Sequence, residues 1–158
     1  DLDDFKRVND RFGHAAGDEA LREAARTMRS TLRETDYVAR IGGDEFLALL
    51  PATGEAQGSW VAERIRATFE RTPIRARVRT TLALTVSVGG GAAPRGPATL
   101  SQLLPRLDLH ARRAKRAGKN RIEVARRAPF PPAAPSRIAT PVTARAAEAA
   151  WGNTAPSA

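Results

Sequence analysis

Apolar residues recur at helical spacing in three segments of the chain, residues 18–32, 61–72 and 100–117. A repeat of three to four residues places these side chains on one face of a helix, with polar residues opposite. Each segment is therefore predicted to be an amphipathic helix. The positions that set the spacing are Leu21, Ala24, Ala25, Met28 and Leu32, then Val61, Ile65 and Phe69, then Leu100, Leu103, Leu104 and Leu107.

Several residues mark the ends of these helices. Asp18 begins an acidic pair where a helix dipole favours negative charge, which predicts that the first helix starts there. Thr99 and Gln102 have the spacing of a capping box, and Gly118 is suited to end the third helix. Pro105 removes a backbone donor inside this helix, so a kink or a late start is expected.

Two short β-prone runs, residues 37–41 and 46–50, flank Gly42 and Gly43. Glycine adopts the positive φ angles that tight hairpin turns require. The two runs are therefore predicted to form an antiparallel hairpin with the glycines in its turn.

Further strands are expected after the second helix. Residues 82–88 alternate apolar and small side chains as a core strand does, residues 75–80 alternate more weakly, and residues 121–124 suit an edge strand. Helices and strands alternate without an internal repeat, which indicates one α/β domain over residues 1–127. Residues 128–158 hold six prolines and many alanines, and are expected to be a disordered tail.

Composition narrows the classes of function. The chain has 158 residues, 42% of them hydrophobic, and no cysteine, so any metal must use oxygen or imidazole ligands. No run approaches the roughly 20 apolar residues of a membrane span, so this segment is expected to be cytoplasmic and free of membrane contact. The net charge of +9 suits a small polyanion such as a nucleotide. Because the arginines are spread evenly, no nucleic-acid partner is expected.

Two adjacent carboxylates, Asp44 and Glu45, follow the glycines in the sequence Arg-Ile-Gly-Gly-Asp-Glu-Phe, residues 40–46. Taken alone, this segment would be an ordinary solvated turn. Two further segments favour a catalytic role for the carboxylates over a solvated turn. They are Asp-Leu-Asp-Asp-Phe-Lys-Arg-Val-Asn-Asp, residues 1–10, and Phe-Gly-His-Ala-Ala-Gly-Asp, residues 12–18.

In motif order and spacing, these segments resemble the GGDEF family of diguanylate cyclases over nearly all of residues 1–124. The resemblance also rests on Arg-Glu-Thr-Asp at 33–36, Thr-Val-Ser-Val-Gly at 85–89, and Ala-Lys with Gly-Lys-Asn-Arg within 114–121. It implies a nucleotidyl-cyclase-like α+β sandwich, in which a mostly antiparallel sheet is flanked by helices.

The resemblance implies an enzyme that condenses two GTP molecules into cyclic di-GMP and releases two pyrophosphates. In a homodimer, the 3′-hydroxyl of one GTP attacks the α-phosphorus of the other, assisted by Mg²⁺ or Mn²⁺. No protein nucleophile takes part, so catalysis is expected to depend on positioning and charge stabilisation.

The family's catalytic and metal-binding residues match positions of this sequence. Asp44 and Glu45 correspond to the catalytic carboxylates, and their division of roles stays open. Asp1, the backbone carbonyl of Leu2, Asp44 and Glu45 correspond to the metal ligands, which are the hard oxygen donors that Mg²⁺ prefers.

Asn9 and Asp18 correspond to the residues that read guanine, because their oxygens can accept from its N1 and N2 groups. Without the resemblance, Asn9 would be assigned as a turn cap and Asp18 as a helix cap. The lysines of the set would otherwise be solvated charges, and His14 is assigned a structural role. The implied GTP-binding set is Asp4, Phe5, Lys6, Asn9, Asp18, Gly42, Gly43, Lys115 and Lys119.

Arg33 and Asp36 form the RxxD motif that binds product at an inhibitory site in this family, and Arg64 matches a further contact. Arginine forks bind phosphate and stack on bases. An ion pair between Arg33 and Asp36 is the alternative. A catalytically inactive domain that binds cyclic di-GMP or GTP is the alternative to an enzyme.

The sequence departs from the family at both ends. It begins where the family's first, central strand is ending, so that strand is largely missing and the chain alone is expected to fold poorly and be inactive. A parental protein could be membrane-anchored through preceding sequence. Near the other end, Pro105 and Arg112 replace residues that would favour packing of the last helix. No sensory domain indicates the input signal.

Overall fold

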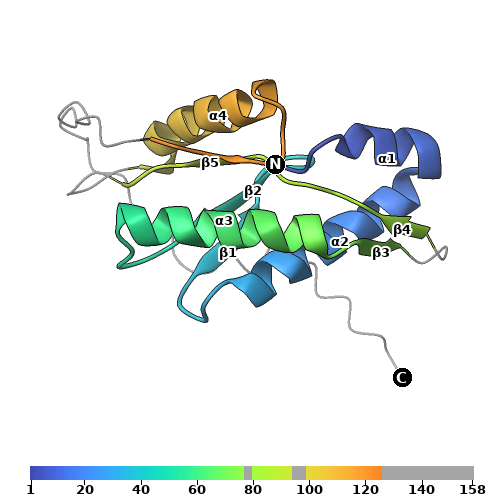
Figure 1. The fold of residues 1–158 in the computed structure, drawn as a ribbon, viewed down its shortest axis with the longest axis horizontal. Helices are drawn as coiled ribbons and strands as arrows, with labels where there is room; N and C mark the ends of the chain where they lie inside the picture. The colour runs from blue at the N-terminus through green and yellow to red at the C-terminus, as the bar shows by residue number, and fades with distance from the viewer. Residues whose placement is uncertain (77–79, 94–98, 126–158) are drawn as a thin grey trace.

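The computed structural model describes residues 1–76, 80–93 and 99–125, which form four helices and six short strands around one core (Figure 1). The predicted tail, residues 128–158, lies outside the described residues. The helices are α1 (Phe5–Phe12), α2 (His14–Thr31), α3 (Glu55–Arg71) and α4 (Leu100–Arg116). The strands are β1 (Tyr37–Arg40), β2 (Phe46–Leu49), β3 (Ile74–Ala76), β4 (Thr80–Leu82), β5 (Val88–Gly90) and β6 (Ile122–Val124).

The first helices differ from the sequence-based expectation. Helix α2 begins at His14, so Asp18 lies in its second turn, and the alternative of Asp18 as a helix cap is wrong. Gly13 separates the two helices with a φ of 80°, a conformation that glycine adopts without strain. Helix α1 was not predicted, because Phe5 and Val8 are its only buried residues.

Helix α4 confirms the predicted capping signals and begins at Leu100, so the expected late start at Pro105 is wrong, while the expected kink stays a prediction. The Thr99 N–H donates to Gln102 Oε1 at 3.0 Å, and Gly118 follows the helix with a φ of 116°. The helix passes through Pro105, which is exposed. The carbonyl that lost its donor is that of Ser101, which is also exposed, so water can satisfy it.

The predicted hairpin is confirmed, although its turn is built differently. Strands β1 and β2 are antiparallel with Arg40 opposite Phe46, which leaves a loop of residues 41–45. Neither Gly42 nor Gly43 has a positive φ. The Glu45 side chain instead folds back against Gly42, where a Cβ would displace its carboxylate.

Residues 1–3 lie between the β1–β2 loop and residues 85–87, and their backbone is hydrogen-bonded to both. The Leu2 N–H donates to the Asp44 carbonyl at 3.1 Å, and the Asp3 N–H donates to the Thr85 carbonyl at 2.9 Å. Leu2 also forms an antiparallel bridge with Val86 and is 1% exposed. The segment is therefore anchored in the interior, although it is not a strand of any of the three sheets.

The predicted core strand at residues 82–88 has the expected burial but is not continuous. Leu82, Leu84 and Val86 are buried, as the alternation predicted. The ladder is split into β4, the bridge at Val86 and β5. Strand β5 pairs in parallel with β6, the predicted last strand, so the pairing is antiparallel only in the other two sheets.

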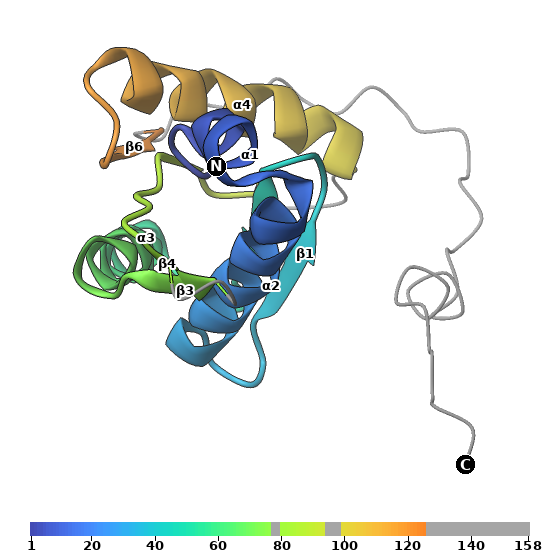
Figure 2. The same ribbon diagram turned by 90° about the vertical axis from the view of Figure 1, so that its right-hand side faces the viewer.

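Helices α3 and α4 cover β6 from opposite sides, with α4 above it and α3 below it in Figure 2. Helix α4 crosses β5 closely, because a Cβ at Gly89 would collide with the backbone of Leu107 and Ala111. In the described part of the chain, no helix is long and apolar enough to cross a membrane. The α+β arrangement of the predicted fold class is confirmed.

Candidate active site

A pocket of about 320 Å³ opens between α1, α2 and the β1–β2 loop. A volume of this size is typical of small-molecule sites. The lining combines two apolar side chains with groups able to pair with a base or a phosphate. It is made of Phe5, Lys6, Asn9, His14, Asp18, Leu21, Arg40, Gly43 and Asp44.

Asn9 and Asp18 meet in this pocket because α1 and α2 approach closely at Gly17. A Cβ at Gly17 would collide with the Asn9 side-chain oxygen and lie against the Phe5 ring. Asn9 is half-buried in α1, whereas Asp18 is exposed on α2. A pocket lined by two side chains with acceptor oxygens and by the apolar Phe5 and Leu21 suits a base that presents N–H donors.

The opposite wall is the β1–β2 loop, which Arg40 holds in shape. Its Nε donates to the carbonyls of Gly42 and Gly43 at 3.1 Å, and its Nη2 donates to Gly43 at 2.8 Å. Asp44, which follows Gly43 in the sequence, also lines the pocket. Sequence reasoning missed Arg40 and assigned His14 only a structural role, although both line the pocket.

The predicted metal-binding segments lie side by side. The Leu2–Asp44 backbone hydrogen bond brings Asp1 next to the β1–β2 loop, and Lys115 Nζ pairs with Asp1 Oδ1 at 2.6 Å. The described residues contain no cluster of three or more acidic or histidine side chains that could hold a metal alone. Asp1 and Asp44 nevertheless fit Mg²⁺, which is typically held by one or two carboxylates plus substrate phosphates.

Lys119 is held beside the start of α1. Its Nζ pairs with Asp4 Oδ1 at 2.8 Å, and this hydrogen bond lowers the pKa of the Asp4 carboxyl. Lys119 and Asn120 both have positive φ angles, 62° and 45°. Such a backbone is unusual outside glycine, so surrounding contacts must hold it.

Asp3 supplies those contacts and was missed as a site residue. It is 3% exposed, and its Oδ2 accepts from the Asn120 N–H at 3.0 Å and the Thr85 hydroxyl at 2.7 Å. Its Oδ1 accepts from the Ser87 hydroxyl at 2.7 Å. The second aspartate of the opening Asp-Leu-Asp was the only signal for it in the sequence.

Arg66 on α3 holds the same loop from the other side. Its side chain is 15% exposed and donates to Glu63, to Glu70 at 3.0 Å and to Asn120 Oδ1 at 2.8 Å. Asn120 Nδ2 also donates to Glu70 at 2.7 Å. These hydrogen bonds lower the pKa of both glutamates and raise that of Arg66, so all three stay charged near neutral pH.

Replacing Arg66 by methionine is therefore expected to loosen the residue 119–120 loop. Loss of charge-assisted hydrogen bonds from a mostly covered side chain should cost about 1–2 kcal/mol in free energy of unfolding. Chemical denaturation measures this change, and Arg22→Met, on the exposed side of α2, is the control. A loss below about 0.3 kcal/mol, the scale of a surface substitution, would contradict this role.

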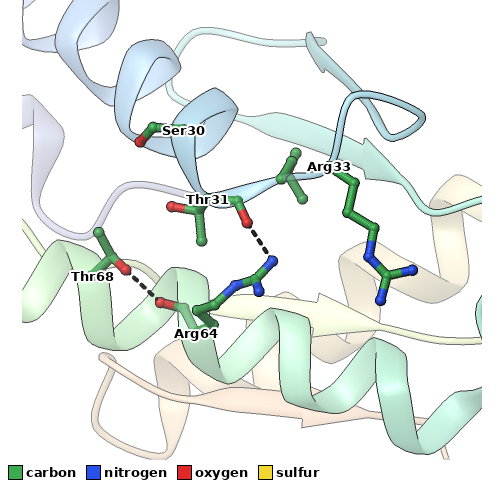
Figure 3. Close-up of a pocket in the computed structure, with 6 residues that line it drawn as sticks. Ser30, Thr31, Arg33, Arg64 and Thr68 are labelled. Atoms are coloured by element: carbon green, nitrogen blue, oxygen red, sulfur yellow. Dashed lines mark hydrogen bonds between the residues drawn. The ribbon is translucent and has the colours of Figure 1, made fainter.

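A second pocket, of about 420 Å³, lies between the end of α2 and α3 and is lined by Ser30, Thr31, Leu32, Arg33, Arg64 and Thr68. Figure 3 shows Arg64 reaching from α3 toward the Thr31 carbonyl, to which its Nη2 donates. The predicted pair Arg33 and Arg64 is thus brought together at one pocket.

Asp36, the third residue of the predicted product site, does not line this pocket. It is 4% exposed, and its Oδ2 accepts from the Arg33 N–H at 2.9 Å. Arg29, which sequence reasoning missed, donates to the Asp36 carbonyl at 2.7 Å. Asp36 therefore shapes the turn that presents Arg33, and the described contacts include no Arg33–Asp36 ion pair.

The predicted GTP-binding and metal-binding residues fall into two neighbouring sets, one that lines the first pocket and one that lies beside it. Glu45 is exposed in the loop against Gly42, outside the pocket lining. The first set lines the pocket: Phe5, Lys6, Asn9, Asp18, Gly43 and Asp44. The second set lies beside it or next to its walls: Asp1, Leu2, Asp4, Gly42, Glu45, Lys115 and Lys119.

Comparison with known proteins identifies the family. The model of the diguanylate cyclase GGDEF domain matches residues 1–121, and the chain belongs to this family. Diguanylate cyclases of the family generally use a divalent metal ion. The chain spans between 18% and 34% of the length of the first curated relatives that it matches.

Individual relatives agree with this assignment. The chain is 43% identical over 125 residues to the diguanylate cyclase DgcP of Pseudomonas aeruginosa, covering 79% of this chain and 18% of DgcP. It is similar to the crystal structure of the diguanylate cyclase SiaD with its activator SiaC from the same species (TM-score 0.71, 41% identity, 79% of this chain, 47% of that one). It is also similar to the GGDEF domain of DgcB from Caulobacter crescentus in complex with cyclic di-GMP (TM-score 0.69, 30% identity, 78% and 73%).

Proposed function

We propose that the protein is a diguanylate cyclase that condenses two GTP molecules into cyclic di-GMP. The observation that carries the proposal is the Leu2–Asp44 backbone hydrogen bond, which brings the segment of Asp1 against Asp44, a residue of the pocket that Asn9 and Asp18 also line. Groups that suit guanine and groups that suit a metal–triphosphate therefore lie at one site.

Different residues serve the base, the metal and the phosphates. Asn9 and Asp18 bind the guanine edge, and this selects GTP over ATP because adenine lacks the N1 and N2 donors. Asp1, the Leu2 carbonyl, Asp44 and Glu45 would hold Mg²⁺ or Mn²⁺, which when bound neutralises phosphate charge and acidifies the attacking hydroxyl. Lys6, Lys115 and Lys119 supply further positive charge to the phosphates. Asp44 and Glu45 receive the proton of the hydroxyl as a pair.

One pocket holds one nucleotide, so the proposed reaction needs a homodimer. Two domains would face each other, with the 3′-hydroxyl of each GTP directed at the α-phosphorus of the other. Catalysis then comes from orientation across the dimer, since no side chain forms a bond to substrate. Gly42 and Gly43 keep the loop beside the phosphates free of side chains.

Binding of a non-hydrolysable GTP analogue tests the site before chemistry. With Mg²⁺, the protein expressed with whatever sequence precedes Asp1 in its gene should bind the analogue, and Asp1→Ala should weaken this binding at least about ten-fold. Asp18→Ala should reduce the preference over the matching ATP analogue by about ten-fold. Metal-independent binding, unchanged in both variants, would contradict the proposed site.

We further propose that the pocket between α2 and α3 binds the product and inhibits the enzyme. Arg33 and Arg64 both line it, and arginine forks suit the phosphates of cyclic di-GMP. Arg33→Ala should lower product affinity at least about ten-fold and relieve the slowing of turnover as product accumulates. Titration calorimetry and progress curves measure these two effects.

The same titrations decide between the enzyme and an inactive receptor. The receptor alternative is favoured if cyclic di-GMP binds while the GTP analogue with Mg²⁺ does not. Arg26→Ala serves as the matched control for Arg33→Ala, because Arg26 is an exposed arginine on α2 whose described contacts are with Glu23. Its replacement should leave product affinity unchanged.

A further inference from the structure

Trp60 is an exposed aromatic side chain beside the second pocket. It is 61% exposed, and the Arg64 guanidinium lies over its ring at 4.6 Å from the centroid. An exposed aromatic ring offers a flat apolar surface on which a base can stack. Its neighbour Arg64 is a pocket residue, so the tryptophan and the pocket are directly connected.

Trp60 lies one helical turn before the pocket residue Arg64 on the same face of α3. Residues four apart lie on one helix face, so Trp60, Arg64 and Thr68 form a single stripe along α3. Arg64 and Thr68 line the pocket, and the stripe continues by one turn to Trp60. In Figure 3, the Arg33 guanidinium lies on the side of Arg64 away from Thr68, toward the amino-terminal turns of α3.

Arg64 is fixed in an orientation that suits stacking. Its Nη2 donates to the Thr31 carbonyl, its guanidinium lies over the Trp60 ring, and its Nε is buried without a hydrogen-bond partner. The Nη2 group of the guanidinium is therefore already hydrogen-bonded within the protein. The exposed surface of Trp60 and the Arg33 guanidinium, which has no ion pair among the described contacts, stay available to a ligand that combines a flat ring with a phosphate.

We propose that Trp60 is a base-stacking wall of this pocket, where a purine base of the bound nucleotide packs on its ring and a phosphate pairs with Arg33. The inference rests on the proposed product site and extends it from phosphate binding to recognition of the base. Stacking on tryptophan gives affinity, and Arg64 beneath the ring adds its cation–π contact.

Tryptophan fluorescence tests this contact directly. The chain has two tryptophans, Trp60 and Trp151, so Trp151→Phe leaves Trp60 as the only one within this sequence. Cyclic di-GMP should quench this emission in a saturable way, whereas ribose 5-phosphate, which lacks a base, should not. No quenching by cyclic di-GMP at concentrations that saturate the pocket by calorimetry would overturn the inference.

Substitutions measure how much the stacking contributes. Trp60→Ala should weaken cyclic di-GMP binding by about five-fold or more, and Trp60→Phe should retain most of the affinity. Phe12→Ala is the matched control, because Phe12 is also exposed, at 38%, with Arg11 over its ring at 5.2 Å. Phe12 does not line the pocket, so its replacement should leave product affinity unchanged.

The outcomes separate this inference from the proposed function. If Trp60→Ala lowers product affinity in a protein without GTP turnover, the stacking wall stands and the enzyme proposal fails. If GTP is converted but Trp60→Ala binds product as well as the parent does, the inference fails and the enzyme proposal stands. If a partner protein protects Trp60 while cyclic di-GMP leaves its emission unchanged, Trp60 is a docking residue and the inference is wrong.

Discussion

Replacing Asp44 by alanine should reduce conversion of GTP to cyclic di-GMP by at least about 10³-fold. Asp44 lines the pocket between α1, α2 and the β1–β2 loop, and its backbone carbonyl accepts from the Leu2 N–H, next to Asp1. Its loss removes both a proposed metal ligand and half of the proposed proton-accepting pair, and general-base removal alone typically costs about 10²–10⁴. Product formation followed by chromatography measures the effect.

Two controls make this result specific to catalysis. Thermal unfolding of Asp44→Ala should match the parent, because Asp44 is only half-buried and its backbone hydrogen bond does not depend on the side chain. Asp10→Ala, at an exposed position of α1 outside the pocket, should keep full turnover. Turnover of Asp44→Ala within ten-fold of the parent would contradict the role of Asp44.

Replacing Asp3 by alanine should destabilise the fold by about 3 kcal/mol or more in free energy of unfolding. The carboxylate accepts from Thr85, Ser87 and the Asn120 backbone, and it is 3% exposed. Its removal leaves the buried Ser87 hydroxyl and the half-buried Thr85 and Asn120 donors without their acceptor, and a fully buried donor left unpaired costs about 1–3 kcal/mol. Urea denaturation of the protein, expressed with whatever sequence precedes Asp1 in its gene, measures the loss.

Asp3→Asn distinguishes hydrogen bonding from packing. The asparagine keeps the shape and one acceptor oxygen, so its loss of stability should lie between those of the parent and Asp3→Ala. The opposite ranking, or a change below about 1 kcal/mol in Asp3→Ala, would contradict the role of Asp3 in holding the 119–120 loop.

Helices α2, α3 and α4 and the β1–β2 hairpin could be predicted from the sequence because their apolar residues recur at the spacing of a helix or a strand. Leu21, Ala24 and Met28 recur at helical spacing and are buried on α2, and Leu82, Leu84 and Val86 alternate and are buried. Helix α1 was missed because a short segment with two buried residues carries too little periodicity. That α4 begins before Pro105 was not predicted, because proline is disfavoured in the interior of a helix.

The site could be predicted in part, because family motifs specify residue types but not their contacts. They pointed to Asn9, Asp18 and Asp44, which line one pocket. They did not reveal that Asp36 shapes a turn, or that Arg40 holds the glycine loop through three carbonyl contacts. Such roles depend on which backbone groups lie nearby after folding.

Product analysis of the parent protein tests the central claim most directly. The protein, expressed with whatever sequence precedes Asp1 in its gene, is incubated with GTP and Mg²⁺, and the products are separated by chromatography and identified by mass. The account predicts one cyclic di-GMP and two pyrophosphates for every two GTP consumed, with no product when the metal is chelated. A folded, dimeric protein that binds GTP with Mg²⁺ but forms no cyclic di-GMP would contradict it.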